Sequence, residues 1–347
     1  MKNKKTNSRT VERTILTVLA VILGILLAAL IGITAYGQHL LGRMNYVDPD
    51  ATIPTLSAEE IAQFENEMDS AEDLLESTAP VMEAENVELG DGPQQEIGGD
   101  EIVNILLIGQ DTRGKSRARS DSMILCTFNK EKNTVTLTSF MRDLYVKIPG
   151  YKRNRINAAY YYGGMQLLND TIYENFGVEV DGNVEVDFSR FKDVIDILGG
   201  VTLELTKGEV AYVNPRATGE SLSEGVNQLN GSQALWYARN RNDVDGDFSR
   251  TNRQRKLINA LIEEYKSKKL TEMLSILSDI LPLVTTDMTR SDITSYVVQL
   301  FPMLETAEIK TQGIPAAGAY QDATIDGMSV LVPDLDKNIE ILVDSLT

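Results

Sequence analysis

The chain has 347 residues, one cysteine, one histidine and a formal net charge of −18, and this inventory excludes several kinds of chemistry. The single cysteine, Cys126, cannot form an internal disulfide, and its apolar surroundings predict a buried side chain. Because His39 is the only histidine, a histidine base or a histidine-rich metal site within a folded domain is excluded. Nucleic acid is not expected as a partner, since its binding depends on a clustered basic surface.

The N-terminal part carries the signals of a membrane anchor. Residues 1–43 hold six Lys or Arg and one Glu, and Ile15–Tyr36 contains no charge. A stretch of that length can cross a bilayer as a helix, and the basic residues before it place the N-terminus in the cytoplasm. A cleaved signal peptide is the alternative, but the apolar stretch exceeds a usual signal core and no convincing cleavage site follows. We therefore predict a cytoplasmic tail at 1–14, a single-pass anchor at 15–36 in the cell membrane, and an extracytoplasmic remainder.

An acidic spacer is predicted for residues 37–100. Between Asp48 and Glu101 the sequence has seventeen Asp or Glu and no Lys or Arg, so the negative charge is concentrated there. A self-repelling segment with prolines, glycines and few apolar residues is typical of an extended linker. Ser57, with Glu60 three residues later, predicts the capped start of a solvated helix within it. The spacer would hold a folded domain away from the membrane.

Strands and helices alternate from Ile102 onward. The first apolar run is continuous and ends at Gly109, as expected of a strand buried on both faces. The predicted strands are 102–108, 123–128, 134–140, 184–188 and 201–205, with a strand-like 330–332 in the tail. The predicted helices are 157–176, interrupted at Gly163–Gly164, 189–198, capped by Ser189, 230–238 and 249–268, with apolar helices after Thr271. This alternation predicts an α/β domain over 101–347, with a central mixed β-sheet sandwiched by helices.

Clusters of charge stand at the ends of these strands. Asp111–Arg113 follows the first strand, Arg119–Asp121 precedes the second, and Arg142–Asp143 follows the third. Ligands of open α/β sheets bind beyond the strand ends, so we expect these side chains to converge there. Isolated surface ion pairs are the alternative.

A second concentration of charge lies between residues 237 and 255. Ser249 is predicted as a helix N-cap, which puts Arg250, Arg253 and Gln254 in the first turn and a half of one helix. Arginines there oppose the helix dipole, but a bound anion would be favourable, because backbone N–H groups and guanidinium groups would both point at it. The alternative is an exposed basic turn whose positive charge is balanced by neighbouring aspartates.

The two clusters together suit a phosphorylated ligand. Guanidinium groups are well matched to a diphosphate, and paired carboxylates suit Mg²⁺, which takes few protein ligands. This is the inventory of phosphoryl transfer, in which positioning and charge neutralisation supply most of the catalysis. The sequence contains no Walker loop and no glycine-rich nucleotide fingerprint.

Nine short motifs, taken in order, resemble those of the LytR-CpsA-Psr family. They lie at 104–113, 119–123, 139–143, 155–160, 186–188, 198–201, 229–235, 237–241 and 247–254. The ordered set, over a core of 104–261, is far more specific than any one motif, and an anchor with an external domain matches the family's usual architecture. Two positions depart from the pattern: Gln110 stands where the family often has a smaller residue, and Arg155 where it often has lysine.

The resemblance implies a reaction. The cargo would be a polyprenyl-diphosphate-linked glycopolymer of teichoic acid or capsule type, and the acceptor would be peptidoglycan, joined through a phosphodiester. It implies that Asp111 and Asp121 bind Mg²⁺, and that Asp247 orients or deprotonates the acceptor hydroxyl, with Arg119 and Arg241 as catalytic partners. The residues implied to hold the diphosphate are Arg119, Arg142, Arg239, Arg241, Arg250 and Gln254.

The lipid would also need an apolar tunnel, and the tyrosine-rich helix after Asn157 is a candidate wall, although core packing explains its residues equally well. Two other functions stay open. One is a hydrolase that cleaves the same lipid diphosphate with water. The other is a non-catalytic, membrane-anchored regulatory or binding protein.

Overall fold

The structure is a computed structural model that describes residues 36–48, 56–57, 59–61, 79–110, 120–242, 246–266, 270–303 and 306–347. The chain divides into two compact units, 1–44 and 45–347, and the larger one contains the central sheet. Within the described residues no helix is long and apolar enough to span a membrane. The predicted anchor, apart from Tyr36, lies outside those residues, and so do most of the predicted spacer helix and the loop at 111–119.

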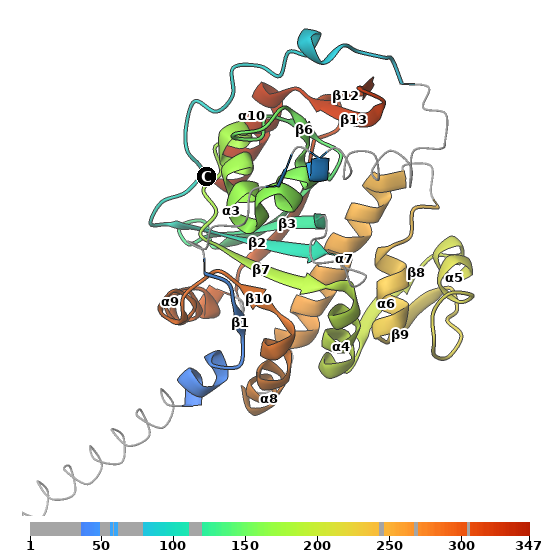
Figure 1. Ribbon diagram of the computed structural model, residues 1–347. Coiled ribbons are helices and arrows are strands. Elements are labelled where there is room, and N and C mark those ends of the chain that lie inside the picture. The colour runs from blue at the N-terminus through green and yellow to red at the C-terminus, as the bar shows by residue number, and fades with distance from the viewer. Residues whose placement is uncertain are drawn as a thin grey trace, which may run out of the picture. The chain divides into compact units, whose positions relative to one another are not determined.

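A central mixed sheet organises the larger unit, as predicted. In the described part of the chain it has seven strands in the order β1-β10-β7-β2-β3-β4-β11 (Figure 1). The strands are β1 (Asn45–Tyr46), β2 (Ile102–Gln110), β3 (Ser120–Asn129), β4 (Thr134–Phe140), β7 (Gly182–Asp187), β10 (Thr285–Thr286) and β11 (Glu308–Ile314). β2, β4, β7 and β11 run in one direction, while β1, β3 and β10 run in the other.

Helices cover both faces of the sheet (Figure 1). On one face, the main core cluster joins β2, β3 and β4 to α3 (Ile156–Phe176) and α10 (Leu335–Leu346). On the other face, Ile258 and Ile262 of α7 (Gly246–Lys266) pack against Leu137 of β4 and Cys126 of β3. Cys126 is buried as predicted, and burial raises the pKa of its thiol to about 12. The α4 helix (Phe188–Leu198) lies on the same face as α7.

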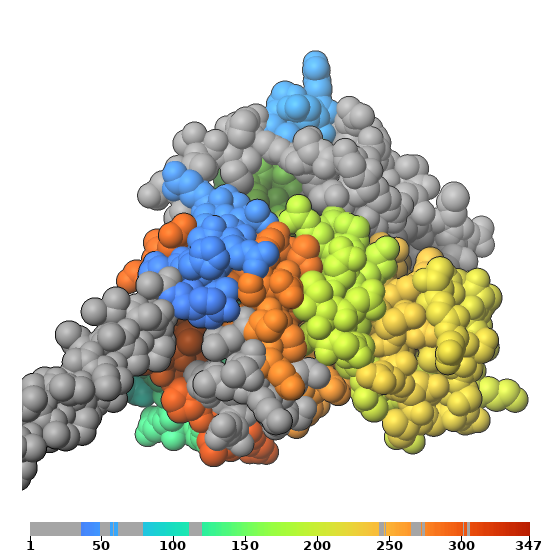
Figure 2. Space-filling view, turned by 90° about the horizontal axis from the view of Figure 1, so that it is seen from below, coloured from blue at the N-terminus to red at the C-terminus, as the bar shows by residue number. Residues whose placement is uncertain are grey.

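An outer lobe extends from this second face. It contains the β8–β9 hairpin (Val201–Leu205 and Gly225–Leu229), α5 (Lys207–Val213) and α6 (Gly231–Ala238), around its own apolar cluster. Figure 2 shows the lobe in yellow beside α4. The strand predicted at 201–205 therefore exists with the predicted bounds, but it pairs with β9 and not with the central sheet.

Several predicted boundaries need correction. The cap of α4 is Asp187, whose carboxylate accepts the backbone N–H of Ser189 at 2.7 Å, so the helix begins one residue before Ser189. The α7 helix begins at Gly246, three residues before the predicted cap Ser249, which puts Arg250 in its second turn. Two predictions of local structure are confirmed. Gly163 and Gly164 have non-helical backbone angles inside α3, and Ser57 and Glu60 form a reciprocal capping box.

The last part of the predicted spacer packs against the folded domain. Val87, Leu89 and Ile97 are buried in the main core, at 3%, 3% and 0% exposure. Ile97 also forms a parallel bridge with Val178. The high density of acidic residues suggested an extended linker throughout, but these three apolar side chains are enough to fix residues 79–100 on the domain.

Candidate functional site

One edge of the central sheet gathers the predicted site. Because β2, β4, β7 and β11 run the same way, they all end at this edge, where β3 begins. The residues at this edge are Gln110, Ser120, Phe140, Asp187 and Ile314. Of the charged motifs predicted to converge here, the described residues Asp121, Arg142 and Asp143 lie close together, whereas Asp111 and Arg119 lie outside the described residues.

A β-bulge turns Asp121 out of the ladder. Gly109 of β2 faces Ser122, and Gln110 faces Ser120, so Asp121 is an extra residue in β3. Such bulges redirect a side chain at a sheet edge. The Asp121 carboxylate lies 3.2 Å from a guanidinium nitrogen of Arg142 and stays 26% exposed, whereas Ser122 faces a cavity on the other side.

Arg142 belongs to a short chain of ion pairs. Its Nε lies 3.4 Å from Asp143, and the other oxygen of Asp143 lies 3.7 Å from Nε of Arg155. Both arginine side chains are at least nine-tenths buried. The predicted clamp residue Arg142 is thus held rigidly by carboxylates on two sides, and Arg155 shares one of those carboxylates.

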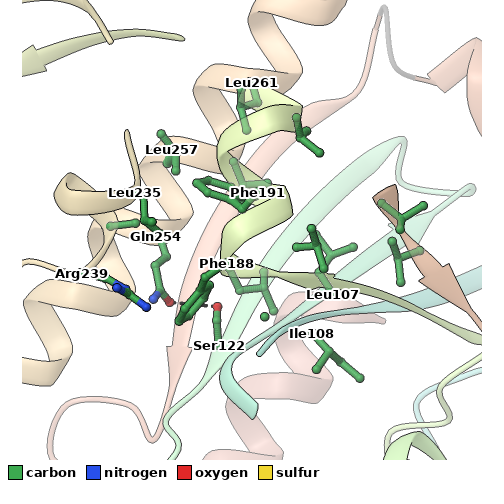
Figure 3. A pocket seen from close by; sticks show the side chains of 18 residues that line it. Leu107, Ile108, Ser122, Phe188, Phe191, Leu235, Arg239, Gln254, Leu257 and Leu261 are labelled. Atoms are coloured by element: carbon green, nitrogen blue, oxygen red, sulfur yellow. Dashed lines mark hydrogen bonds between the residues drawn. The ribbon is translucent and has the colours of Figure 1, made fainter. Parts of the chain in front are cut away.

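An apolar cavity of about 190 Å³ lies between the sheet and the helices of the second face (Figure 3). Its walls are aliphatic and aromatic side chains from β2, β3, β7, α4, α6 and α7, with three polar side chains among them. They include Leu107, Ile124, Val184, Val186, Phe188, Phe191, Val194, Leu235, Leu257 and Leu261. The predicted tunnel wall was wrong for this cavity, because α3 packs on the opposite face of the sheet.

The polar side chains gather at one end of this cavity. Arg239, the C-cap of α6, has its guanidinium carbon 4.8 Å from the centre of the Phe188 ring and 5.9 Å from that of Trp236. Gln254 of α7 accepts a hydrogen bond from the hydroxyl of Ser122 at 3.0 Å (Figure 3). The ring stacking fixes the plane of the guanidinium, and the hydrogen bond orients the amide.

Arg253 of α7 connects its helix to α5 and to the backbone that follows Arg239. Its Nε lies 2.8 Å from a carboxylate oxygen of Glu209 on α5, and its Nη1 donates to the backbone oxygen of Asn240 at 2.8 Å. Burial alone raises the pKa of Glu209, but hydrogen bonds from Thr206 and Arg253 hold it below its usual range. Arg253 was predicted to face the anion, but it is buried and ties α7 to the loop between Arg239 and Arg241.

A half-buried carboxyl that sequence reasoning missed lies on the α3 side of the same edge. Glu185 of β7 accepts hydrogen bonds from the Tyr160 hydroxyl and from the side chain of Gln110. Burial raises its pKa, and the nearby Asp187 carboxylate adds to the shift. The available signal was an acid at the centre of an apolar strand, Val184-Glu-Val186.

The remaining predicted residues are only partly described. Asp111 and Arg119 lie outside the described residues, and of Asp247 only the backbone is described, in the first turn of α7. Arg250 is buried in the next turn, and Arg241 is half-buried just after α6. Among the residues that the structure describes, no three acidic, histidine or cysteine side chains gather in a way that could hold a metal ion.

The site combines an apolar cavity with cationic and amide groups at its end and an acid–arginine pair across the sheet edge, an arrangement that can hold an apolar chain with an anionic head. A model of the LytR_cpsA_psr family matches residues 65–343. The chain belongs to this family.

Named relatives share much of the chain. The regulatory protein MsrR of Staphylococcus aureus (strain COL) is 31% identical over 229 residues, which are 65% of this chain and 68% of MsrR. TagU of Bacillus licheniformis, a polyisoprenyl-teichoic acid–peptidoglycan teichoic acid transferase, is 38% identical over 171 residues, 49% of this chain and 54% of TagU. The solved structure of TagT bound to LIIa-WTA matches with a TM-score of 0.59 and 26% identity, over 75% of this chain and 96% of TagT.

Proposed function

We propose that the protein transfers a polyprenyl-diphosphate-linked glycopolymer onto peptidoglycan in a Mg²⁺-dependent reaction that leaves a phosphodiester. The observation that carries the proposal is the apolar cavity that ends at Arg239 and Gln254, beside the sheet edge with Asp121 and Arg142. A prenyl chain suits the cavity, and a diphosphate suits the guanidinium groups at its end. The transferase name of TagU and the LIIa-WTA complex of TagT support the same reaction class.

The residues at the edge fit Mg²⁺. The Asp121 carboxylate is partly exposed although it is paired with Arg142, and Asp111 directly follows the end of β2. Mg²⁺ takes one or two carboxylates together with substrate phosphates, so these two aspartates are a sufficient protein contribution. When bound, the ion would neutralise charge on the diphosphate.

The protein's own groups would bind and orient the reactants. Arg142, Arg239, Arg241 and Arg250, with the predicted Arg119, would hold the diphosphate oxygens and offset the charge that builds up during transfer. The acceptor hydroxyl oxygen bonds to the phosphorus that carries the polymer, its proton passes to Asp247, and the bond to the lipid phosphate breaks. Lipid monophosphate leaves, so atoms and charge balance.

The site of this reaction would be outside the cell membrane. Anchor 15–36 and the acidic segment after it would keep the folded domain on the outer side, within reach of a membrane-bound lipid carrier and of peptidoglycan. Either a teichoic acid or a capsule-type polymer fits the proposed cargo class.

The proposal is tested with the full-length chain in a mild detergent, a polyprenyl-diphosphate saccharide, Mg²⁺ and an unlinked glycan strand. Mass spectrometry would detect the phosphodiester-linked product. Arg239→Ala is expected to lower the rate about 10²-fold or more, and Asp247→Ala to abolish transfer. Arg290→Ala, which removes an exposed arginine on α9 (Arg290–Leu300), is the matched control and should keep full activity.

Two outcomes would replace the proposal. Lipid monophosphate released without linkage, in the presence of a competent acceptor, would identify a hydrolase. Tight diphosphate binding with neither product would identify a non-catalytic binding protein. MsrR, a relative, is named a regulatory protein.

A further inference from the structure

Another arginine of α7, Arg255, does not line the apolar cavity. The guanidinium group of Arg255 rests against Gly313 of β11, with Nη1 only 3.3 Å from the point where a Cβ at Gly313 would stand. The absence of a side chain at this glycine gives the guanidinium its place on the sheet. Gly313 is the penultimate residue of β11, so this contact lies at the same edge as the candidate site.

Ser139 faces the same place. It is the register partner of Gly313 across the β4–β11 pair, so the two positions are neighbours on one face of the sheet. That face is the one covered by α7, because Leu137 and Ile309, two and four residues earlier in their strands, pack against α7. The Ser139 hydroxyl and the Arg255 guanidinium therefore converge between α7 and the ends of β4 and β11.

Neither group has found a partner. Within the described structure, Nε and Nη1 of Arg255 and Oγ of Ser139 are shielded from solvent and make no hydrogen bond. Burial alone lowers the pKa of Arg255, with no acid beside it to oppose the shift. Arg253, two residues earlier on the same helix, is paired with Glu209 and Asn240.

Such an arrangement is costly unless something completes it. Buried polar groups in native proteins are nearly always hydrogen-bonded, and a buried cation without a counter-charge destabilises the fold. Groups kept in that state are found where a ligand supplies the missing partner. Nε and Nη1 are shielded, but the Arg255 residue as a whole is half-buried, so the guanidinium lies near the surface and not in the centre of the core.

We propose that Arg255 and Ser139 form a subsite for a phosphate-type oxyanion, separate from the groups at the end of the apolar cavity. The register of the sheet puts the Cα atoms of Ser139 and Ser122 roughly 8 Å apart, since they lie on adjacent strands and two residues apart in register. Because Ser122 is hydrogen-bonded to Gln254, the subsite lies about the length of one sugar unit from the polar end of the cavity. We assign the subsite to the first phosphodiester of the polymer after the diphosphate, and this assignment rests on the proposed function. Free phosphate is the other anion with the same chemistry.

Binding is tested without the transfer reaction. The melting temperature of the full-length chain in detergent would be measured against inorganic phosphate for the wild type, Arg255→Met, Ser139→Ala and Arg239→Ala. In the absence of phosphate, Arg255→Met is expected to melt at the same temperature or a few °C higher, because an unpaired buried cation is removed. Phosphate at tenfold its Kd should raise the melting temperature of the wild type and of Arg239→Ala by about 3 °C.

The two subsite variants should lose this response, measured in the Arg239→Ala background so that the main clamp contributes less. Ser139→Ala guards against a folding defect specific to the arginine variant. An undiminished phosphate response in both variants would overturn the subsite, and so would a lower melting temperature of Arg255→Met in the absence of phosphate.

Two donors of equal length distinguish between the two sources of the anion. One donor has a phosphodiester in its first polymer unit, and the other has none. A rise in KM of about tenfold for Arg255→Met with the phosphodiester donor alone would assign the polymer. An equal KM for both donors, with the phosphate response still lost, would assign free phosphate. If no donor reacts with the wild type, the proposed function fails, whereas the phosphate response still decides the subsite.

Discussion

At the scale of single residues, the site is defined by how each charge is held. Arg142 sits between two carboxylates, Arg239 lies on aromatic rings, and Arg255 has no partner among the described residues. Identical side chains are therefore suited to different tasks. A guanidinium held by carboxylates is rigid, one stacked on rings can still bind an oxyanion edge-on, and an unpartnered one is completed only by a ligand.

Glu185 should make stability depend on pH in a direction opposite to most acids. Because its folded-state pKa is raised, the native state holds the proton more tightly than the unfolded chain. This contribution is full below the unfolded pKa of about 4.3 and is lost as pH rises through the folded pKa. Urea unfolding of the wild type and of Glu185→Gln, which keeps the shape and one acceptor oxygen, would measure the difference.

The expected result is that Glu185→Gln gains stability relative to the wild type as pH rises from 4.5 to 7.5. A difference that stays constant over this range would mean that the carboxyl is ionised in the folded protein throughout. Glu88→Gln, a change at an exposed glutamate without a resolved contact, is the control.

At the scale of elements, the position of the clamp depends on how α5, α6 and α7 are joined. Glu209 closes the capping box of α5 with Thr206 and also binds Arg253 of α7. Arg253 in turn holds the backbone between the two predicted clamp arginines of the loop after α6. One buried ion pair thus sets the relative position of three helices.

Breaking this ion pair should affect both stability and activity. Glu209→Gln is expected to cost roughly 3 kcal/mol of unfolding free energy, because it leaves Arg253 as an uncompensated buried charge. The double variant Glu209→Leu/Arg253→Met should recover most of that stability in chemical denaturation. It should not recover transfer, since the loop at Asn240 loses its hydrogen bond. Full activity in the stable double variant would limit the pair to a structural role.

The apolar cavity should select lipid length. Val194→Phe on α4 adds a ring to a half-buried lining position and is expected to change stability by less than about 1.5 kcal/mol. It should weaken the binding of a long prenyl diphosphate about tenfold while leaving a short-chain analogue unaffected, as measured by calorimetric titration. Val297→Phe on the exposed face of α9 is the matched control.

How much of this could be read from the sequence differs between elements. The β4 strand was predicted with its full bounds because its seven residues are all buried. The start of β2 was predicted correctly from its continuous apolar run, but the strand continues through Gly109 and Gln110, two residues beyond the predicted end. β11 was missed, since it is an outer strand in which only Ile309 and Ile314 are strongly apolar. The start of α7 was misplaced because Ser249 resembles a cap, and the ion pair of Arg253 depends on a glutamate forty-four residues away.

The site residues show the same limit. Asp121 and Arg142 lie together, as expected where parallel strands end at one edge, while Asp111 and Arg119 stay predictions because they lie outside the described residues. The cavity was not predicted, since its walls come from six elements whose apolar residues each look like ordinary core. Its position became evident only when the packing of α4 and α7 on the sheet was known.

At the scale of the whole molecule, the boundary between spacer and domain lies earlier than charge density suggests. Val87, Leu89 and Ile97 bury apolar surface that stabilises the fold by roughly 5 kcal/mol. A chain that begins at Ile102 should therefore melt several °C lower than one that begins at Asn45, or fail to fold. Thermal unfolding of the two truncated chains, followed by circular dichroism, would decide this. Equal melting temperatures would mean that residues 79–100 belong to the spacer and not to the folded domain.

The bulge at Asp121 separates the two sides of the site, with its own carboxylate turned to Arg142 and Ser122 turned to the cavity. In the proposed reaction the lipid would leave the sheet edge beneath the helices, while the polymer would leave it toward solvent. The protein would hold the lipid in the cavity and, at the sheet edge, the diphosphate and the first unit of the polymer, and it would not touch the polymer beyond that unit. An enzyme built in this way need not measure its cargo, so chains of any degree of polymerisation could be attached at the same rate, and the length of the finished wall polymer would be decided before it arrives.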